Sequence, residues 1–394
     1  MSTLGLYIQV PFCASKCSFC NFSSRVERPA VFDAYLRGLH EELCGWDDHF
    51  AGRGIPREIL SFSLDSIYVG GGTPSLLGGA RLQTLLRSVQ GRLTRTDDVE
   101  FTLEVTPGSA DPDLLRALRQ IGVNRLSIGV QTFADRELKA VGRLHSAVAS
   151  SELVATARRE GYGNISLDLI AGLPYQTEAS FQASLEATAR LRPEHVSLYL
   201  FEVDEKSRLG REVVHGGKRY HAAAVPGDDF MAEAYERGCN FLAREGYRQY
   251  EISNFALPGF ESRHNQKYWR LAPYLGLGAG AHSFDGERRW ANHADVNAYL
   301  NKVNSGESPI DDFRPLTAEA QVEEFFFLGL RQGEGVDLRV AKERWGPECL
   351  RAWKDKLDAL AQEGWLVIEQ DRVRLTCSAY LVSNEIFQEF VGVA

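Results

Sequence analysis

The first half of the chain alternates short apolar runs with helical segments, and this rhythm restricts the possible folds more than any other feature. Six strand-like runs, rich in β-branched and aromatic residues, occupy residues 5–10, 65–69, 99–105, 125–130, 165–170 and 196–203. Segments with helical periodicity separate them, as at residues 31–43, 111–121 and 178–191. Repeated β-then-α units predict a parallel sheet with right-handed crossovers. We therefore expect an α/β fold with a partial, six-unit β/α barrel, whose functional site lies at the carboxyl ends of the strands.

After about residue 200 the rhythm loosens, which divides the chain into three predicted parts. Residues 1–230 are expected to form the barrel, 231–312 a barrel extension, and 313–394 a C-terminal α+β domain. Residues 206–227 predict an exposed connection. The last part predicts three helices, a β-hairpin at 365–376 and a final helix at 379–390, an arrangement that resembles a winged helix. Its Lys and Arg residues alternate with Asp and Glu, which favours a structural cap over a DNA-binding module.

Composition argues against several classes of protein. The formal net charge of −9 argues against a general affinity for nucleic acid. No apolar run reaches eighteen residues, so we expect no integral membrane protein, and the first residues lack the features of a signal peptide. Three of the seven cysteines are clustered, which is typical of a metal site in a reducing compartment. A cytoplasmic location is the expectation.

The clustered cysteines, Cys13, Cys17 and Cys20, directly follow the first predicted strand. Thiolates are soft ligands that suit iron–sulfur clusters and zinc. A zinc site would need a fourth local ligand, but the next residues are Asn21 and Phe22. Three ligands in one tight loop therefore predict a 4Fe-4S cluster with one iron left open for another ligand.

Polar residues stand at the ends of the following strands. The second strand ends in a glycine triplet, whose backbone can approach a ligand closely. A carboxylate inside the apolar run 167–170 would be costly without a partner. The residues in question are Gly70, Gly71, Gly72, Thr73, Glu104, Gln131, Arg143 and Asp168. Singly, each is more often a cap or a turn, but together they predict a zwitterionic, hydroxyl-bearing ligand beside the cluster.

The cysteine loop and the glycine triplet together resemble the radical S-adenosylmethionine (SAM) superfamily. Further pieces, at residues 7–13, 70–75, 129–133 and 168–174, resemble the oxygen-independent coproporphyrinogen III oxidase family. The resemblance implies that Cys13, Cys17 and Cys20 bind the cluster, and that SAM binds its open iron. It also implies SAM contacts from Tyr7, Gly71, Gly72, Thr73 and Glu104. Phe19, Gln131, Arg143 and Asp168 match positions that line a second SAM site in the decarboxylase.

Two features resemble the heme-chaperone branch of this family. The decarboxylase carries a further cysteine two residues after its third ligand, where this chain has Phe22. The second feature is a His-Asn-x-x-Tyr-Trp signature, which implies heme binding by His264, Tyr268 and Trp269. A neutral imidazole can be an axial iron ligand, and the two aromatic rings could cover a porphyrin face. A hydrogen-bonded structural histidine is the simpler reading of the residues alone, and His282 and Cys239 are alternative ligands.

The resemblance thus implies a heme chaperone with a SAM-ligated 4Fe-4S cluster. It would hand heme to an acceptor hemoprotein, and a membrane-associated respiratory protein is one candidate acceptor. No residue is assigned a catalytic role. The alternative is a radical enzyme that decarboxylates coproporphyrinogen III oxidatively to protoporphyrinogen IX. A winged-helix regulator with a sensing cluster is a third, more distant reading.

Overall fold

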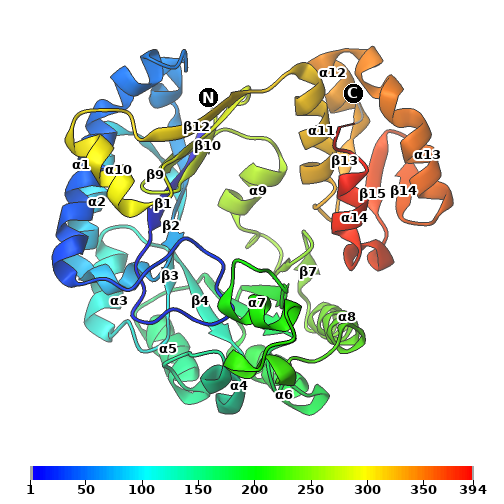
Figure 1. Ribbon diagram of the computed structural model, residues 1–394, viewed down its shortest axis with the longest axis horizontal. Helices are drawn as coiled ribbons and strands as arrows, with labels where there is room; N and C mark the ends of the chain where they lie inside the picture. The colour runs from blue at the N-terminus through cyan, green and yellow to red at the C-terminus, as the bar shows by residue number, and fades with distance from the viewer. Residues whose placement is uncertain (1–2, 393–394) are drawn as a thin grey trace.

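The computed structural model describes residues 3–392, in which a 12-stranded sheet is the main body. Its strands follow the order β12-β11-β10-β9-β1-β2-β3-β4-β5-β6-β8-β7. Figure 1 shows the helices wrapped around the outside of this sheet. The predicted partial barrel of six parallel strands is confirmed and forms the centre of the sheet. Its strands are β1 (Thr3–Val10), β2 (Ser63–Gly71), β3 (Arg95–Val105), β4 (Arg125–Gln131), β5 (Ile165–Ala171) and β6 (His195–Leu200).

The crossover helices begin where the sequence supplies caps. The Asp111 side chain accepts a hydrogen bond from the Leu114 amide, and a proline opens the same helix, α3. A capping box formed by Thr177 and Ser180 starts α6. The helices of the barrel are α1 (Pro29–Ala51), α2 (Gly78–Arg92), α3 (Pro112–Gln120), α4 (Asp135–Ala140), α5 (Ala147–Arg159) and α6 (Glu178–Leu191), with short 3-10 turns η1 (Arg57–Ser61) and η2 (Pro74–Leu77).

Strands from later in the chain extend the sheet at both edges. β9 (Tyr274–Leu277) pairs in parallel with β1, and β10 (His282–Phe284), β11 (Arg288–Asn292) and β12 (Ile310–Pro315) follow antiparallel. At the other edge, β8 (Asn254–Ala256) pairs antiparallel with β6 and then with β7 (Arg248–Gln249). The helices of this region are α8 (Asp228–Arg244), α9 (Arg263–Trp269) and α10 (Val296–Asn304). The sequence did not predict strands β9 to β12, since a glycine interrupts the apolar pattern of β9 and β10 has only three residues.

A buried carboxylate fixes this extension to the barrel. Glu42 of α1 is only 2% exposed and accepts hydrogen bonds from the Gly278 amide at 2.9 Å, the Asn292 side chain at 2.6 Å and the Tyr299 hydroxyl at 2.7 Å. These three donors come from the β9–α10 region, so one acceptor joins it to the first helix.

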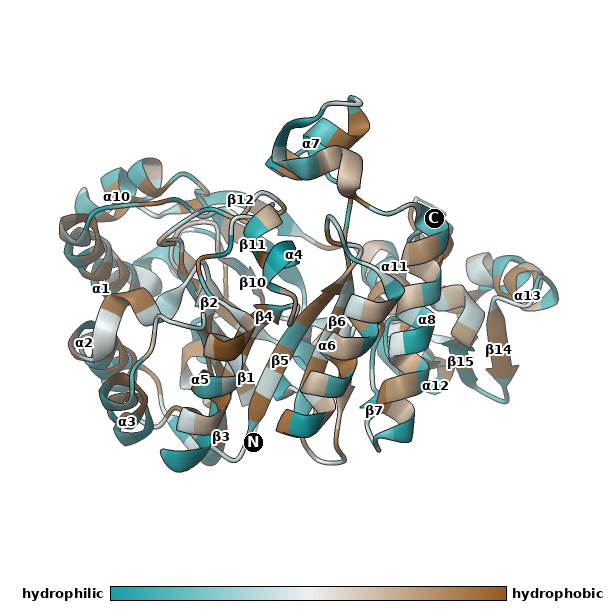
Figure 2. Ribbon diagram, turned by 90° about the horizontal axis from the view of Figure 1, so that it is seen from below, coloured by the Kyte–Doolittle hydropathy of each residue, from teal (hydrophilic) through white to brown (hydrophobic). Residues whose placement is uncertain are grey.

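The segment predicted as an exposed connection contains a helix, so that prediction was wrong in part. Ser207 caps α7 (Arg208–Val214), and a 3-10 turn, η3 (Arg219–Ala224), follows. Figure 2 shows α7 standing out from the body of the protein. Its Leu209 amide donates to the Ser18 carbonyl at 2.8 Å, which ties this projection to the cysteine loop.

The C-terminal region has its own apolar core, in which Phe326, Trp353 and Phe390 pack together. It lies beside the barrel in Figure 1, and β13, β15 and β14 form a small sheet. Its elements are α11 (Ala318–Gly329), β13 (Val336–Asp337), α12 (Leu338–Trp345), η4 (Pro347–Trp353), α13 (Lys354–Gln362), β14 (Leu366–Glu369), β15 (Arg372–Leu375), η5 (Cys377–Tyr380) and α14 (Ser383–Gln388). The expected hairpin is present, and the final helix is shorter than predicted. The division of the chain at residues 230 and 312 stays a prediction.

Among residues 3–392, none of the helices has the length and apolar character needed to span a bilayer.

Candidate functional site

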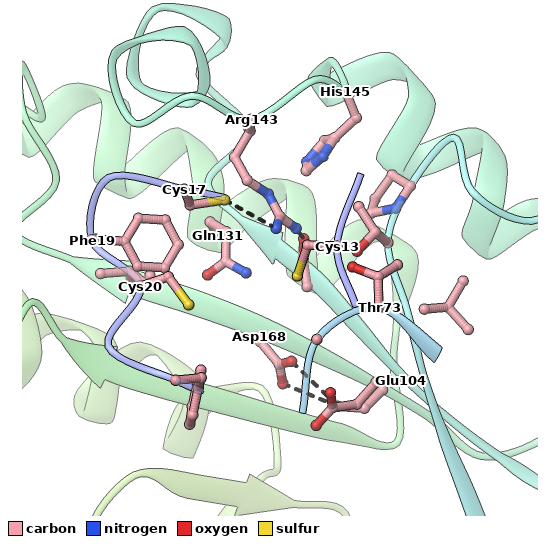
Figure 3. A pocket seen from close by; sticks show the side chains of 18 of the residues that line it. Cys13, Cys17, Phe19, Cys20, Thr73, Glu104, Gln131, Arg143, His145 and Asp168 are labelled. Atoms are coloured by element: carbon pink, nitrogen blue, oxygen red, sulfur yellow. Dashed lines mark hydrogen bonds between the residues drawn. The ribbon is translucent and has the colours of Figure 1, made fainter. Parts of the chain in front are cut away.

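A cavity of about 1150 Å³ opens at the carboxyl ends of the parallel strands, where a barrel site is expected. The cysteine loop, the glycine turn after β2 and the ends of β3 to β6 line it. In Figure 3 the sulfur atoms of Cys13, Cys17 and Cys20 lie in this cavity, and another wall carries Glu104 and Asp168. Segments far apart in the sequence thus meet at one place.

Backbone hydrogen bonds shape the cysteine loop. The Cys13 amide donates to the Arg25 carbonyl at 3.0 Å, and the Arg25 amide returns a bond to the Pro11 carbonyl at 2.9 Å. Across the cavity mouth, the Ser18 amide donates to the Val141 carbonyl at 3.0 Å. These hydrogen bonds fix the path of the loop. Its three cysteines form no disulfide within residues 3–392, and all three line the cavity.

The donor set fits a cluster better than a single metal ion. Within residues 3–392, no three His, Cys, Asp or Glu side chains converge as ligands of one ion. An iron–sulfur cluster does not require such convergence, since thiolates hold it at separate irons. Arg143 adds positive charge: one guanidinium nitrogen lies 3.7 Å from the Cys17 sulfur, and its Nε is buried without a partner. A cation beside a thiolate stabilises the charged form that binds metal.

The glycine turn packs directly against the cysteine loop. The Gly72 amide donates to the Val10 carbonyl at 2.9 Å and the Thr73 amide to the Phe12 carbonyl at 2.7 Å. A Cβ at position 72 would overlap the backbone of Phe12, so only glycine fits there. Gly71 has φ of 108°, which also favours glycine. The triplet therefore sets the position of the loop that carries the cysteines.

Two carboxyl groups share the inner wall of the cavity. Glu104 accepts from the Tyr68 hydroxyl and the Gly71 amide, both at 3.0 Å, while Asp168 lies 3.3 Å from the Ser127 hydroxyl. Burial, and then the charge of Asp168, raises the pKa of Glu104 to about 7. Burial likewise raises the pKa of Asp168. The pair is therefore suited to hold a proton near neutral pH, or to face a cationic ligand.

The structure brings most of the predicted site residues together. Those that line the cavity are Cys13, Cys17, Phe19, Cys20, Gly71, Gly72, Thr73, Glu104, Gln131, Arg143 and Asp168. Tyr7, His264, Tyr268 and Trp269, and the alternative ligands His282 and Cys239, are not among its lining residues. Tyr7 lies close by, with its hydroxyl 2.6 Å from Gln9 and its ring stacked on Tyr68.

His264 is buried behind the cavity lining, and both of its ring nitrogens are hydrogen-bonded. It is 1% exposed, with Nδ1 3.1 Å from the Ser66 hydroxyl and Nε2 2.8 Å from the Tyr268 hydroxyl. Burial lowers the pKa of His264 to about 3, so the ring is neutral. Its helix, α9, is fastened to the early strands, since the His264 amide donates to Glu100 of β3 at 3.1 Å and Lys267 lies 2.8 Å from Asp65 of β2. Coordination of iron by His264 would need one of its two ring hydrogen bonds, to Ser66 or to Tyr268, to break.

The sequence analysis did not predict several residues that line the cavity. They occupy alternate positions on neighbouring strands: Arg125, Ser127 and Gly129 on β4, Ser166 on β5, and His195, Ser197 and Tyr199 on β6. Asn265, next to His264, also lines the cavity. The signal was a period-two pattern of polar residues inside otherwise apolar strands, since alternate side chains of a barrel strand face its interior.

Comparisons with known proteins agree with this architecture. The family model of the radical SAM superfamily matches residues 7–188, and that of the HemN C-terminal domain matches residues 316–382. Heme chaperone HemW of Bacillus subtilis is 35% identical over 98% of this chain and 98% of its own length. Heme chaperone HemW of Escherichia coli is 35% identical over 99% and 98%. The solved structure of coproporphyrinogen III oxidase (HemN) from Escherichia coli, a radical SAM enzyme, covers 100% of this chain and 91% of its own, with a TM-score of 0.85. At 24% identity, that likeness shows a shared fold.

Proposed function

Because this chain belongs to the HemW family of heme chaperones, we propose that it binds heme and passes it to an acceptor hemoprotein. The observation that carries the proposal is the similarity to HemW proteins along nearly the whole chain, including the barrel and the C-terminal region. Phe22 adds support, because an exposed aromatic residue stands at the cavity mouth where the decarboxylase has a cysteine. The proposed acceptor is a hemoprotein, and the proposed location is the cytoplasm.

The cavity residues fit the cofactors of the radical SAM superfamily. Cys13, Cys17 and Cys20 would hold a 4Fe-4S cluster. The backbone of the glycine turn and the carboxylate of Glu104 would bind SAM, and Gln131, Arg143 and Asp168 lie where a further polar ligand could contact them. When bound, the cluster supplies an open iron and a site of electron transfer. The chain itself orients the ligands, and the Arg143 guanidinium lies beside the Cys17 sulfur.

The cavity mouth offers a surface for a flat, amphipathic ligand such as heme. Phe22 and Leu144 line the cavity and are 65% and 77% exposed. Lys16 and Lys139 line the same cavity. The Lys16 ammonium already donates to the carbonyls of Phe22 and Ser24, and that of Lys139 could pair with a carboxylate. Apolar area beside positive charge is the combination that a porphyrin with propionate side chains requires. Contact between His264 and heme iron stays a prediction. Both of its ring nitrogens are hydrogen-bonded to other side chains.

The C-terminal region is proposed to act as a structural cap and not to bind nucleic acid. Several of its basic side chains already pair with acidic ones, so little free positive charge faces outward. The ion pairs are Lys342 with Asp371 at 2.7 Å, Lys356 with Glu389 at 2.5 Å, and Arg374 with Glu369 at 3.4 Å. Duplex binding that weakens steeply with salt would contradict this assignment.

Anaerobic reconstitution with two ligands in parallel tests the function. The cluster-loaded protein receives hemin, and the absorption spectrum is recorded for wild type and for His264→Ala. A second sample receives coproporphyrinogen III, SAM and a reductant, and porphyrin products are measured. We expect a heme spectrum and no protoporphyrinogen IX. Absence of heme binding by the wild type refutes the proposal, and product formation would instead favour the oxidase.

A further inference from the structure

The barrel interior between β4 and β6 is polar, which sets it apart from an ordinary barrel core. Barrel interiors are usually filled by branched apolar side chains. Here the inward-facing side chains include Arg125, Ser166 and His195, and Asn265 of α9 joins them as a fourth lining residue. We call the part of the cavity that these four residues line the inner chamber. They line the same cavity as the cysteine loop, so the chamber is continuous with the mouth.

Arg125 is a buried cation without a counter-ion. It is 2% exposed and begins β4. Its guanidinium makes a single hydrogen bond within residues 3–392, to the Thr102 hydroxyl at a long 3.4 Å, and Nε is buried without a partner. No Asp or Glu oxygen of the described chain lies within ion-pair distance of it. A buried, unpaired charge costs folding free energy, so proteins retain one where a ligand or a partner compensates it.

The neighbouring groups leave this charge available. Burial lowers the pKa of His195 well below its usual value and that of His264 to about 3, so neither ring adds a competing cation. Burial raises the pKa of two acids that line the same cavity, Asp168 and Glu104, although the charge of Arg125 lowers that of Asp168. Both are already hydrogen-bonded to other residues, through Ser127 and through Tyr68. Within residues 3–392, the guanidinium of Arg125 therefore has no direct contact with a carboxyl group.

A chain of hydrogen bonds supplies a second donor. The Ser262 amide donates to the Tyr250 hydroxyl at 3.4 Å, so Tyr250 is free to donate its own proton to His195 Nε2, 2.9 Å away. Nδ1 of the neutral ring then carries the hydrogen and donates to the Ser166 hydroxyl at 2.8 Å. With Nδ1 as the donor, Ser166 accepts that bond, and its own hydroxyl proton is available for a ligand in the chamber.

From a guanidinium and a hydroxyl donor on one wall, we infer that the inner chamber binds a carboxylate of a ligand that reaches inward from the mouth. Guanidinium and carboxylate groups match in shape and charge, and such bonds are about twice as strong as neutral ones. Two sources share this chemistry, a heme propionate and the amino-acid carboxylate of SAM. The heme source rests on the proposed function, whereas the SAM source does not.

Paired ligands that differ only in the carboxylate distinguish the sources. The cluster-loaded full-length protein is titrated with hemin and with hemin dimethyl ester, and separately with SAM and with decarboxylated SAM. The variants are Arg125→Met, which removes the charge at similar volume, and Ser166→Ala, which removes the second donor. Arg87→Met is the matched control, because Arg87 is exposed on α2 and forms no ion pair within residues 3–392.

We expect Arg125→Met to weaken one acid ligand by about ten- to a hundredfold, the range of a charge-assisted hydrogen bond. Its ester or decarboxylated partner should bind the variant as it binds wild type, and Arg87→Met should change neither. The acid ligand that is weakened identifies the source. Ser166→Ala should weaken the same ligand by a smaller factor, and it decides the question if Arg125→Met does not fold.

Two results would overturn the inference. Arg125→Met could bind both acid ligands with wild-type affinity, which would leave the chamber without a role in binding. Alternatively, it could weaken the acid and its neutral partner equally, which would make Arg125 a structural residue. Failure of the wild type to bind hemin at all would refute the proposed function instead, and the SAM pair would still test the chamber.

Discussion

Glu104 should make the cluster-free protein less stable as the pH rises, and Glu104→Gln should remove this effect. Burial and the nearby charge of Asp168 raise the pKa of Glu104 from 4.5 to about 7. The folded protein therefore keeps the proton at pH values where the unfolded chain has released it. For a carboxyl with a raised pKa, the stabilising effect of the bound proton is complete below pH 4.5 and is lost as the pH rises through 7.

The size of the effect follows from the distance between the two pKa values. Each pH unit between them changes the free energy of unfolding by about 1.4 kcal/mol, so ~3.5 kcal/mol is the upper limit. Glu104 opens partly onto the cavity, where water screens its charge. We therefore expect about 2 kcal/mol.

Urea unfolding of wild type and Glu104→Gln at pH 5 and at pH 8.5 measures this difference. The variant should gain little at pH 5 and about 2 kcal/mol at pH 8.5 relative to wild type. Glu41→Gln, at an exposed position of α1, is the control and should show no pH-dependent gain. A gain that is the same at both pH values, or a loss at pH 8.5, would refute the reasoning, because it would mean that Glu104 ionises as it does in water.

Three further changes test contacts that hold the cysteine loop, the barrel extension and α9 in place. Gly72→Ala should lower the iron bound per chain after reconstitution, because its Cβ would overlap Phe12, whereas Gly91→Ala on the open face of α2 should bind iron normally. Glu42→Ala should lower the free energy of unfolding by at least ~3 kcal/mol, as three buried donors lose their acceptor. His264→Ala should cost ~2–4 kcal/mol in urea unfolding, and an unchanged midpoint would show that its ring bonds contribute nothing.

Local patterns predicted the centre of the fold well. The six parallel strands could be read because each is a short apolar run closed by a turn, and every crossover has a helical period. The cysteine loop and the glycine turn were found for the same reason, since both are contiguous motifs. Their meeting in one cavity also followed from the sequence, because the carboxyl ends of parallel strands share an edge of the sheet.

Features that depend on distant pairing were not predictable. β9 joins the sheet beside β1 although about 270 residues of sequence separate them, and no local pattern encodes that register. Arg125 looked like an ordinary first residue of a strand, and its lack of a counter-ion is visible only when the surrounding strands are in place. The position of His264 was equally hidden, because its partner Ser66 lies on β2.

The placement of α9 gives the signature motif at residues 264–269 a structural role beside the cavity. This role does not depend on iron binding by His264. His264 and Lys267 fasten the helix to β2 and β3, and Asn265 lines the cavity. The motif thus helps to close the barrel interior beside Arg125. A closed, poorly hydrated interior strengthens the attraction between a guanidinium and a carboxylate, because less water screens it. Loss of the motif would therefore weaken ligand binding in the chamber even if His264 never touches the ligand.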